Sequence, residues 1–246
     1  MRPESLVESI FPGSEVVRAW ELAGGVSARA TAVELRRADG EAERLVIRRH
    51  RRAAMEFRLL RLLQAAGVAA PSPRHADEEC IVTSYVEGES GTGQNDPAQL
   101  AAALAELHRV DWSAVDLSFL PRLADGPAQP ETLLQGDFWP GNTLWEDGRL
   151  VALIDWEDAA VGDPLADLAN GRLEVLFAFG EGAMNAFTDA YRAAMPELEY
   201  AELPRWDQFA VRRLVPEIPR WGLDPAKEEE LRRSSQWFAT RAARSS

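Results

Sequence analysis

The chain has 246 residues, enough to bury a sizeable core as one large domain or as two smaller lobes. Its formal net charge of −13 repels a phosphate backbone and argues against nucleic-acid binding. Cys80 is the only cysteine, which excludes an intrachain disulfide, and no stretch approaches the length of a membrane span. The first residues lack the apolar run of a secretory signal, so we expect a cytoplasmic protein that does not bind membranes.

The N-terminal part has the pattern of an antiparallel sheet. Runs rich in β-forming residues cover 16–22, 28–37 and 43–49, with glycine-containing turn signals between them. Apolar residues then recur at helical spacing over 51–66, which predicts a helix. A proline-rich segment, expected to be a loop, leads to a further strand over 80–86.

The composition changes after Glu87, where polar and small residues are followed by mainly helical patterns. We therefore expect two domains, an N-lobe over 1–86 and a C-lobe over 87–246. Within the second, the pair Asp147-Gly148 predicts a hairpin between two short strands. Helices are expected over 100–110, 164–179, 183–195, 203–215 and 225–244.

Three polar residues stand at regular intervals around this hairpin. Asn142 follows Asp137 by five residues, and Asp155 ends the second apolar run. Phosphoryl transfer needs a group that orients the attacking hydroxyl and ligands for metal ions that neutralise phosphate charge, and this set can supply both. For Asp137 or Asn142 alone, the capping of a turn beside a buried strand end is the favoured interpretation, so the prediction of a site depends on the set.

The segment QGDFWPGN, from Gln135 to Asn142, resembles the signature His-Gly-Asp-x-x-x-x-Asn of the aminoglycoside phosphotransferase family. IDWE from Ile154 and GDPLADLA from Gly162 resemble the segments that follow it in that family. The family consists of relatives of protein kinases that phosphorylate small molecules. The resemblance implies an α+β, two-lobed protein-kinase-like fold, with a small antiparallel-sheet N-lobe that carries one helix and a larger, mainly helical C-lobe.

The resemblance also implies roles for the three residues and ATP and Mg²⁺ as cofactors. Asp137 would accept or orient the substrate hydroxyl, and Asn142 and Asp155 would hold Mg²⁺ against the ATP phosphates. Gln135 stands where the family usually has histidine, which supports the loop through hydrogen bonds. Because a glutamine amide both donates and accepts hydrogen bonds, the loop geometry can survive this exchange.

Candidate nucleotide-binding residues lie in the N-terminal part. The stretch around Gly25 and Ser27 resembles the family's phosphate-covering hairpin, although paired glycines are often only a tight turn. LVIRR stands in place of Val-Ala-Ile-Lys, so Arg48 would replace the phosphate-binding lysine, with Glu56 as its predicted ion-pair partner. The alternatives are a solvent-facing arginine at a strand edge and a solvated helix glutamate.

The segment TSYVEG resembles the linker between the two lobes. There the backbone groups of Ser84, Tyr85 and Val86 would offer hydrogen bonds to adenine. The three histidines have no metal-ligand spacing, and His108 matches a Leu-His pair typical of the family at that helix end. A structural role in packing or capping is therefore expected for His108.

The leading hypothesis is an ATP- and Mg²⁺-dependent phosphotransferase that acts on a hydroxyl of a small molecule, and the negative charge favours a cationic acceptor such as an aminoglycoside. One alternative is a metabolic kinase of the choline, homoserine or fructosamine type. Another is a nucleotide-binding pseudoenzyme, suggested by Gln135 and by the arginine at position 48. The sequence leaves the acceptor, the choice between ATP and GTP and the oligomeric state open.

Overall fold

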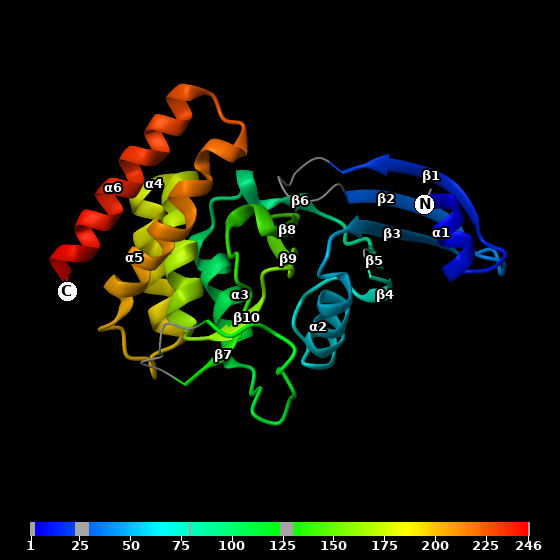
Figure 1. Ribbon diagram of the computed structural model, residues 1–246, viewed down its shortest axis with the longest axis horizontal. Coiled ribbons are helices and arrows are strands. Elements are labelled where there is room, and N and C mark those ends of the chain that lie inside the picture. Colours follow the sequence, from blue (N-terminus) through cyan, green and yellow to red (C-terminus); the bar gives the residue numbers. More distant parts are fainter. Residues whose placement is uncertain (1–2, 23–29, 79, 124–129, 246) are drawn as a thin grey trace. The chain divides into compact units, whose positions relative to one another are not determined.

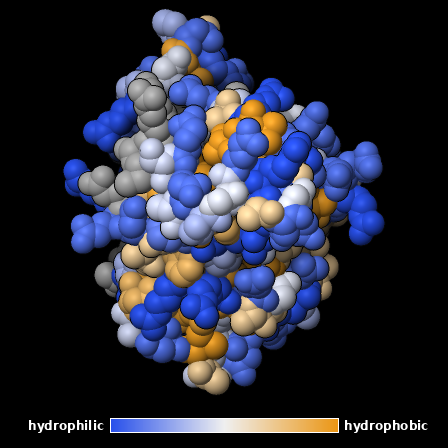
Figure 2. All heavy atoms as spheres, turned by 90° about the vertical axis from the view of Figure 1, so that its right-hand side faces the viewer, coloured by the Kyte–Doolittle hydropathy of each residue, from blue (hydrophilic) through white to orange (hydrophobic). Residues whose placement is uncertain are grey.

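The computed structural model describes the chain except for residues 1–2, 23–29, 79, 124–129 and 246. Judged by its internal contacts, the chain divides into two compact units, Met1–Glu87 and Gly88–Ser246. In the described part of the chain, every helix is too short or too polar to cross a membrane. Polar side chains cover most of the face drawn in Figure 2, where apolar residues form small separate patches.

The first unit combines a five-stranded antiparallel sheet with two helices (Figure 1). Its elements are α1 (Pro3–Ile10), β1 (Glu15–Glu21), β2 (Ala30–Arg36), β3 (Ala42–Arg49), α2 (Ala53–Ala65), β4 (Pro73–Ala76) and β5 (Cys80–Ser84). The strand order is β1-β2-β3-β5-β4. Buried Leu45 and Ile47 alternate along β3 with more exposed residues, and Leu6 and Val7 of α1 join the same core. Helix α1 and apolar side chains from one face of the sheet thus form a single buried cluster.

The expected meander is confirmed for β1, β2 and β3, whereas two elements of this unit were not predicted. Helix α1 precedes the sheet. The segment expected to be a proline-rich loop instead contains β4, at the edge of the sheet next to β5. Pro73 is the first residue of β4, a position where proline removes no hydrogen bond from the sheet interior.

In its described residues the second unit is mainly helical, with one short strand before its first long helix and four more between its first two long helices (Figure 1). The strands are β6 (Glu89–Ser90), β7 (Thr132–Leu134), β8 (Thr143–Glu146), β9 (Arg149–Leu153) and β10 (Ala160–Gly162). The helices are α3 (Pro97–Arg109), α4 (Pro164–Ala194), α5 (Leu203–Leu214) and α6 (Pro225–Ser245), with short 3-10 helices at Gly91–Gly93, Pro140–Asn142 and Val215–Trp221. All five helical regions expected in this part are helical in the structure.

Two strand pairings hold the segment around Asp137 in place. The predicted hairpin is formed by β8 and β9, and its turn residues Asp147 and Gly148 both have positive φ, 49° and 73°, as in a type I′ turn. Strand β7, which precedes the loop, pairs antiparallel with β10, where Leu133 faces Val161. The loop therefore begins and ends at strands that belong to small sheets.

Helix α4 is the central helix of the second unit. Every residue from Pro164 to Val175 is buried, as expected for a helix surrounded by other elements. At Gly180 the backbone leaves helical geometry, with φ 85° and ψ 179°. The two helices predicted over 164–179 and 183–195 are therefore two arms of one kinked element.

Candidate active site

The loop that carries Asp137 runs from β7 to the 3-10 helix Pro140–Asn142, where β8 begins. Gly136 precedes Asp137 and has no room for a side chain, because a Cβ there would lie 1.9 Å from the carbonyl oxygen of Asp158. Any other residue would force these two backbone segments apart. The start of the loop is thus packed directly against the segment that follows Asp155.

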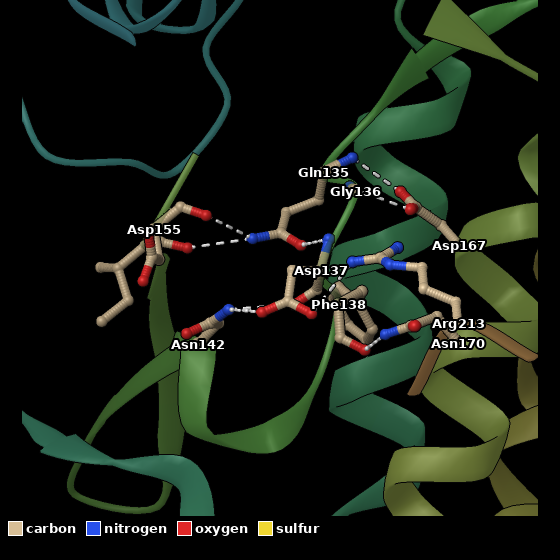
Figure 3. Close-up of polar contacts among 10 residues, drawn as sticks. Gln135, Gly136, Asp137, Phe138, Asn142, Asp155, Asp167, Asn170 and Arg213 are labelled. Atoms are coloured by element: carbon tan, nitrogen blue, oxygen red, sulfur yellow. Dashed lines mark hydrogen bonds and ion pairs between the residues drawn. The ribbon is translucent and has the colours of Figure 1, made fainter. Parts of the chain in front are cut away.

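Asp137 and Asn142 are in direct contact (Figure 3). Asn142 Nδ2 donates to the Asp137 carboxylate oxygen Oδ2 at 3.2 Å and to the Asp137 backbone carbonyl at 2.9 Å. Since these bonds use the N–H groups of the amide, the amide oxygen of Asn142 points away from Asp137. That oxygen remains the group with which Asn142 can bind a cation.

Asp155 lies just beyond the end of β9 and next to Asn142. The backbone N–H of Ile154 donates to the carbonyl oxygen of Asn142 at 2.9 Å, which brings the two segments together. Asp155 has φ 60°, a left-handed conformation that costs a residue with a side chain about 1–3 kcal/mol. Strain of this kind persists only where the surroundings enforce it, and it is concentrated at functional sites.

Gln135 connects the loop to the backbone at Asp155 (Figure 3). Its Nε2 donates to the carbonyl oxygens of Ile154 and Asp155 at 3.1 and 2.8 Å, and its Oε1 accepts from the N–H of Asp137 at 2.7 Å. The side chain is buried. Gln135 thus uses both halves of its amide to hold the Asp137 and Asp155 segments together.

Side chains on one face of α4 hold the loop through hydrogen bonds to its backbone. The Asp167 carboxylate accepts from the backbone N–H groups of Gln135 and Gly136 at 2.7 and 3.0 Å. Asn170, one turn further along α4, donates through Nδ2 to the carbonyl oxygen of Phe138 at 3.0 Å. Both side chains are buried, so these hydrogen bonds are formed away from water.

His108 completes the support of Asp167. Its Nε2 lies 3.3 Å from the Asp167 carboxylate, and its Nδ1 lies 2.6 Å from the hydroxyl of Tyr191 on the second arm of α4. The ring is buried between α3 and α4. The structure therefore gives His108 the structural role that was expected from its position.

The surroundings of Asp137 oppose its ionisation. Burial raises the pKa of Asp137 to about 6; the charges of Asp158 and Asp155 also raise it, whereas Arg213 and the hydrogen bond from Asn142 lower it. Arg213, on α5, places its Nη2 3.3 Å from Asp137 Oδ1. A carboxylate in such a position accepts a proton more readily than one in water.

Glu174 is a further carboxyl group on the same side of α4. Burial and the charge of Asp137 raise the pKa of Glu174 to about 8, against the opposing effect of Arg213. Glu174 lies one turn beyond Asn170, so three polar residues of α4 are directed to the same region. At neutral pH this carboxyl group is mostly protonated.

The donor groups fit a magnesium ion. Within the residues that the structure describes, no three His, Cys, Asp or Glu side chains group closely enough to form a metal site of their own. Mg²⁺ commonly takes one or two protein oxygen ligands and completes its shell with water and substrate phosphates. The amide oxygen of Asn142 and the carboxylate of Asp155 would be such a pair.

In the first unit, Arg48 and Glu56 form the predicted ion pair. Arg48 Nη1 lies 2.8 Å from Glu56 Oε1, and His50 Nε2 lies 2.7 Å from Glu56 Oε2. Glu56 is buried and Arg48 is mostly buried, so neither is the solvated side chain of the alternative interpretation. Gly25 and Ser27, also predicted to contact the nucleotide, lie outside the described residues.

The predicted adenine-binding backbone is partly occupied by hydrogen bonds of the first unit. The N–H of Ser84 donates to the carbonyl of Ser72 at 2.8 Å, and the N–H of Tyr85 donates to the carbonyl of Arg44 at 2.9 Å. A nucleotide cannot use these two donors without breaking the bonds. The prediction for this segment therefore narrows to its carbonyl oxygens and to the N–H of Val86.

Four residues around the loop were not predicted as site residues. Asp167, Asn170 and Glu174 stand three and four residues apart on a helix whose first turns are mostly apolar, a helical spacing that could have identified them as one polar face. Arg213 had no such signal, because nothing in its local sequence distinguishes it from the neighbouring Arg212. Its contact with Asp137 depends on how α5 packs.

Comparisons with known proteins give consistent matches. The sequence matches the model of a family described as the phosphotransferase enzyme family over residues 20–126 and 112–201, more than half of the chain. Viomycin phosphotransferase of Streptomyces vinaceus is 28% identical over an alignment of 115 residues, and the match covers 37% of this chain and 40% of that protein. The matching region thus spans about two fifths of this curated relative.

Two solved structures share the fold. A Ralstonia eutropha protein described as an aminoglycoside phosphotransferase has a TM-score of 0.71 at 13% identity, covering 98% of this chain and 97% of that one. The APH(2″)-IIa protein, in a ternary complex with streptomycin and ATP, has a TM-score of 0.59 at 17% identity, covering 86% and 88%. At these identities the likeness concerns the fold, and it confirms the expected α+β, protein-kinase-like architecture.

Proposed function

Because the chain belongs to the phosphotransferase enzyme family, we propose that it transfers the γ-phosphoryl group of ATP to a hydroxyl group of a small molecule. The observation that carries this proposal is the joint placement of three residues. Asn142 contacts the carboxylate of Asp137 and, through its backbone, the segment that ends in Asp155. ATP as the donor is supported by the shared fold with a complex that contains ATP.

In this proposal Asp137 orients the acceptor hydroxyl and takes its proton. As the acceptor oxygen forms a bond to the γ-phosphorus, the bond from that phosphorus to the bridging oxygen breaks, and its electron pair leaves with ADP. The raised pKa of Asp137 suits a group that must receive a proton during the reaction.

Asn142 and Asp155 would hold Mg²⁺, which neutralises phosphate charge when it is bound. The fixed backbone of Asp155 and the bonds of Gln135 support this role, because they leave the ligand groups little freedom to move. The histidine that Gln135 replaces would serve the same purpose. The replacement therefore gives no reason to prefer the pseudoenzyme hypothesis.

The first unit would hold the nucleotide. We propose residues 1–86 as the nucleotide-binding lobe and residues 87–246 as the lobe with the catalytic loop. The Arg48–Glu56 pair supports a phosphate-anchoring role, because a buried carboxylate fixes the direction of the guanidinium group. Arginine can bind phosphate oxygens with two N–H groups at once, whereas lysine binds them with a single ammonium group. An arginine can therefore take the place of the lysine.

For the acceptor we propose a cationic, hydroxyl-bearing molecule of the aminoglycoside type. The name of the viomycin phosphotransferase relative and the streptomycin in the complex of similar fold support antibiotic acceptors. The net charge of −13 supports a cation, since negative surface potential concentrates cations near the protein.

The test is Mg²⁺-dependent ADP release by the purified chain with a panel of aminoglycosides, amino alcohols and uncharged alcohols. We expect release with at least one cationic acceptor. Asp137→Asn should lower kcat by at least about 1,000-fold while MgATP affinity, measured by calorimetry, changes little, because Asp137 acts on the hydroxyl. Turnover that persists in this variant would remove Asp137 from its role, and MgATP binding without ADP release from any acceptor would favour the pseudoenzyme.

A further inference from the structure

Arg213 contacts the carboxylate that is proposed to take the proton (Figure 3). Its Nη2 lies 3.3 Å from Asp137 Oδ1, on the carboxylate oxygen that Asn142 does not bind. Asn142 and Arg213 together hold both carboxylate oxygens of Asp137. A guanidinium group has five N–H donors in a rigid plane, and this contact uses one of them.

The packing of α5 on α4 determines where Arg213 points. Arg172 of α4 and Asp207 of α5 form a buried two-pronged ion pair, with Nε–Oδ1 and Nη2–Oδ2 distances of 2.9 and 3.1 Å. Trp206, the neighbour of Asp207, donates through Nε1 to Asp163, the residue that caps the start of α4, at 3.2 Å. Helix α5 is therefore fixed at two points before it reaches Arg213.

Within the residues that the structure describes, Arg213 provides the positive charge that contacts Asp137. The loop from Asp137 to Asn142 contains no basic side chain, so none of its own residues can balance the carboxylate. Asp155 and Asp158 add negative charge to the same region, as the direction of their effect on Asp137 shows. Arg213 is the basic residue that α5 brings to this negative region from outside the loop.

We propose that Arg213 is a positioning residue for phosphoryl transfer, which holds the Asp137 carboxylate in the correct orientation toward the acceptor hydroxyl. This inference rests on the proposed function. Because Arg213 acts through Asp137, its loss should reduce kcat and leave the affinity for nucleotide unchanged. Misplacement of a reacting group by about 1 Å commonly costs about 100-fold in rate, which sets the expected size of the effect.

The experiment compares Arg213→Ala, Arg213→Lys and Arg212→Ala with the wild-type chain. We expect Arg213→Ala to lower kcat on the order of 100-fold, with acceptor KM and MgATP affinity within about twofold of wild type. Arg213→Lys should keep part of the activity. Arg212 is exposed and adjacent in the sequence, so Arg212→Ala removes the same charge without touching Asp137 and should retain full kcat.

Added guanidinium ion provides a second readout. Small guanidinium compounds should restore part of the kcat of Arg213→Ala, should not raise that of the wild type, and should not rescue Asp137→Asn, which lacks the carboxylate to be bound. Melting temperatures of all variants show whether a loss is due to unfolding. If Arg213→Ala is unstable, Arg213→Lys together with guanidinium rescue at a lower temperature decides the question.

Four results would overturn the inference. An unchanged kcat in Arg213→Ala would show that Asp137 needs no partner, and a change confined to acceptor KM would make Arg213 an acceptor-binding group. If guanidinium does not restore the kcat of Arg213→Ala, and Arg212→Ala loses as much kcat, the cause would be a general effect of charge. No ADP release by the wild type would overturn the proposed function as well, whereas release with a fully active Arg213→Ala would overturn this inference alone.

Discussion

Burial of Glu174 raises its pKa, so that near neutral pH its carboxyl group favours the protonated form in the folded protein and the ionised form in the unfolded chain. Its pKa is raised from 4.5 to about 8 by burial and by the charge of Asp137. Between these two values the folded protein binds one more proton at this site than the unfolded chain does. The stability that this group contributes is therefore fully present below about pH 4.5 and is lost as the pH rises through about 8.

Glu174→Gln should remove this pH dependence, because the amide has the shape of the neutral carboxyl group and never ionises. At about pH 5 we expect similar free energies of unfolding for the variant and the wild type. At about pH 9 the variant should be more stable by up to about 5 kcal/mol, since each pKa unit between 4.5 and about 8 corresponds to about 1.4 kcal/mol. Urea denaturation at both pH values measures the difference. Equal loss of stability in both proteins at high pH would show that Glu174 ionises without cost.

Residue identity predicts some of the site and not the rest. Asp137, Asn142 and Asp155 could be selected because three oxygen ligands occur at fixed intervals in one short segment. The contacts of Arg213 could not, because they link residues 76 positions apart and depend on the packing of two helices. For Gln135 the sequence indicated only that its amide can donate and accept hydrogen bonds. The structure shows the partners, which include the carbonyl oxygen of Asp155 and the N–H of Asp137.

At the scale of single elements, the kink in α4 places unusual demands on one residue. Gly180 has φ 85° and ψ 179°, a conformation essentially restricted to glycine. No atom lies within 4 Å of where a Cβ would be placed on Gly180, so the restriction comes from its backbone conformation. Gly182 also has open space around it, but its φ is not positive.

These two glycines make a matched pair of substitutions. Gly180→Ala should destabilise the protein by about 1–3 kcal/mol, the cost of placing a side chain in this backbone region. Gly182→Ala should stabilise it by about 0.4–1 kcal/mol, because alanine restricts the unfolded chain and favours the helix. Thermal unfolding of both variants measures the two effects. A neutral or stabilising Gly180→Ala would mean that the kink can straighten at no cost.

Elements with a clear repeating pattern were predictable, and those that depend on neighbours were not. The hairpin of β8 and β9 follows from the turn residues Asp147-Gly148. Strand β4 has too short and too proline-rich a sequence to indicate a strand, and it exists because β5 offers a free edge with which to pair. Helix α1 is likewise stabilised by packing, through Leu6 and Val7, on the core of the sheet.

At the scale of the whole molecule, the net charge of −13 affects how charged acceptors reach the protein. Raising the ionic strength from about 0.02 to about 0.5 M should lower kcat/KM for a polycationic acceptor by roughly three- to tenfold, because salt screens the attraction. For an uncharged acceptor kcat/KM should stay nearly constant. Steady-state kinetics across this salt range tests the prediction. An equal change in kcat/KM for both acceptors would show that the net charge of the protein does not affect acceptor binding.

The hydrogen bonds between α4 and the loop also bear on how the protein can move. Asp167 and Asn170 bind the loop at Gln135, Gly136 and Phe138 from a single rigid helix. Such a loop has little motion of its own, and a shift of α4 would carry it along as one body. Access for a substrate and release of a product must therefore depend on the motion of other segments, while Asp137, the proposed base, stays stationary with respect to the helix that holds its loop.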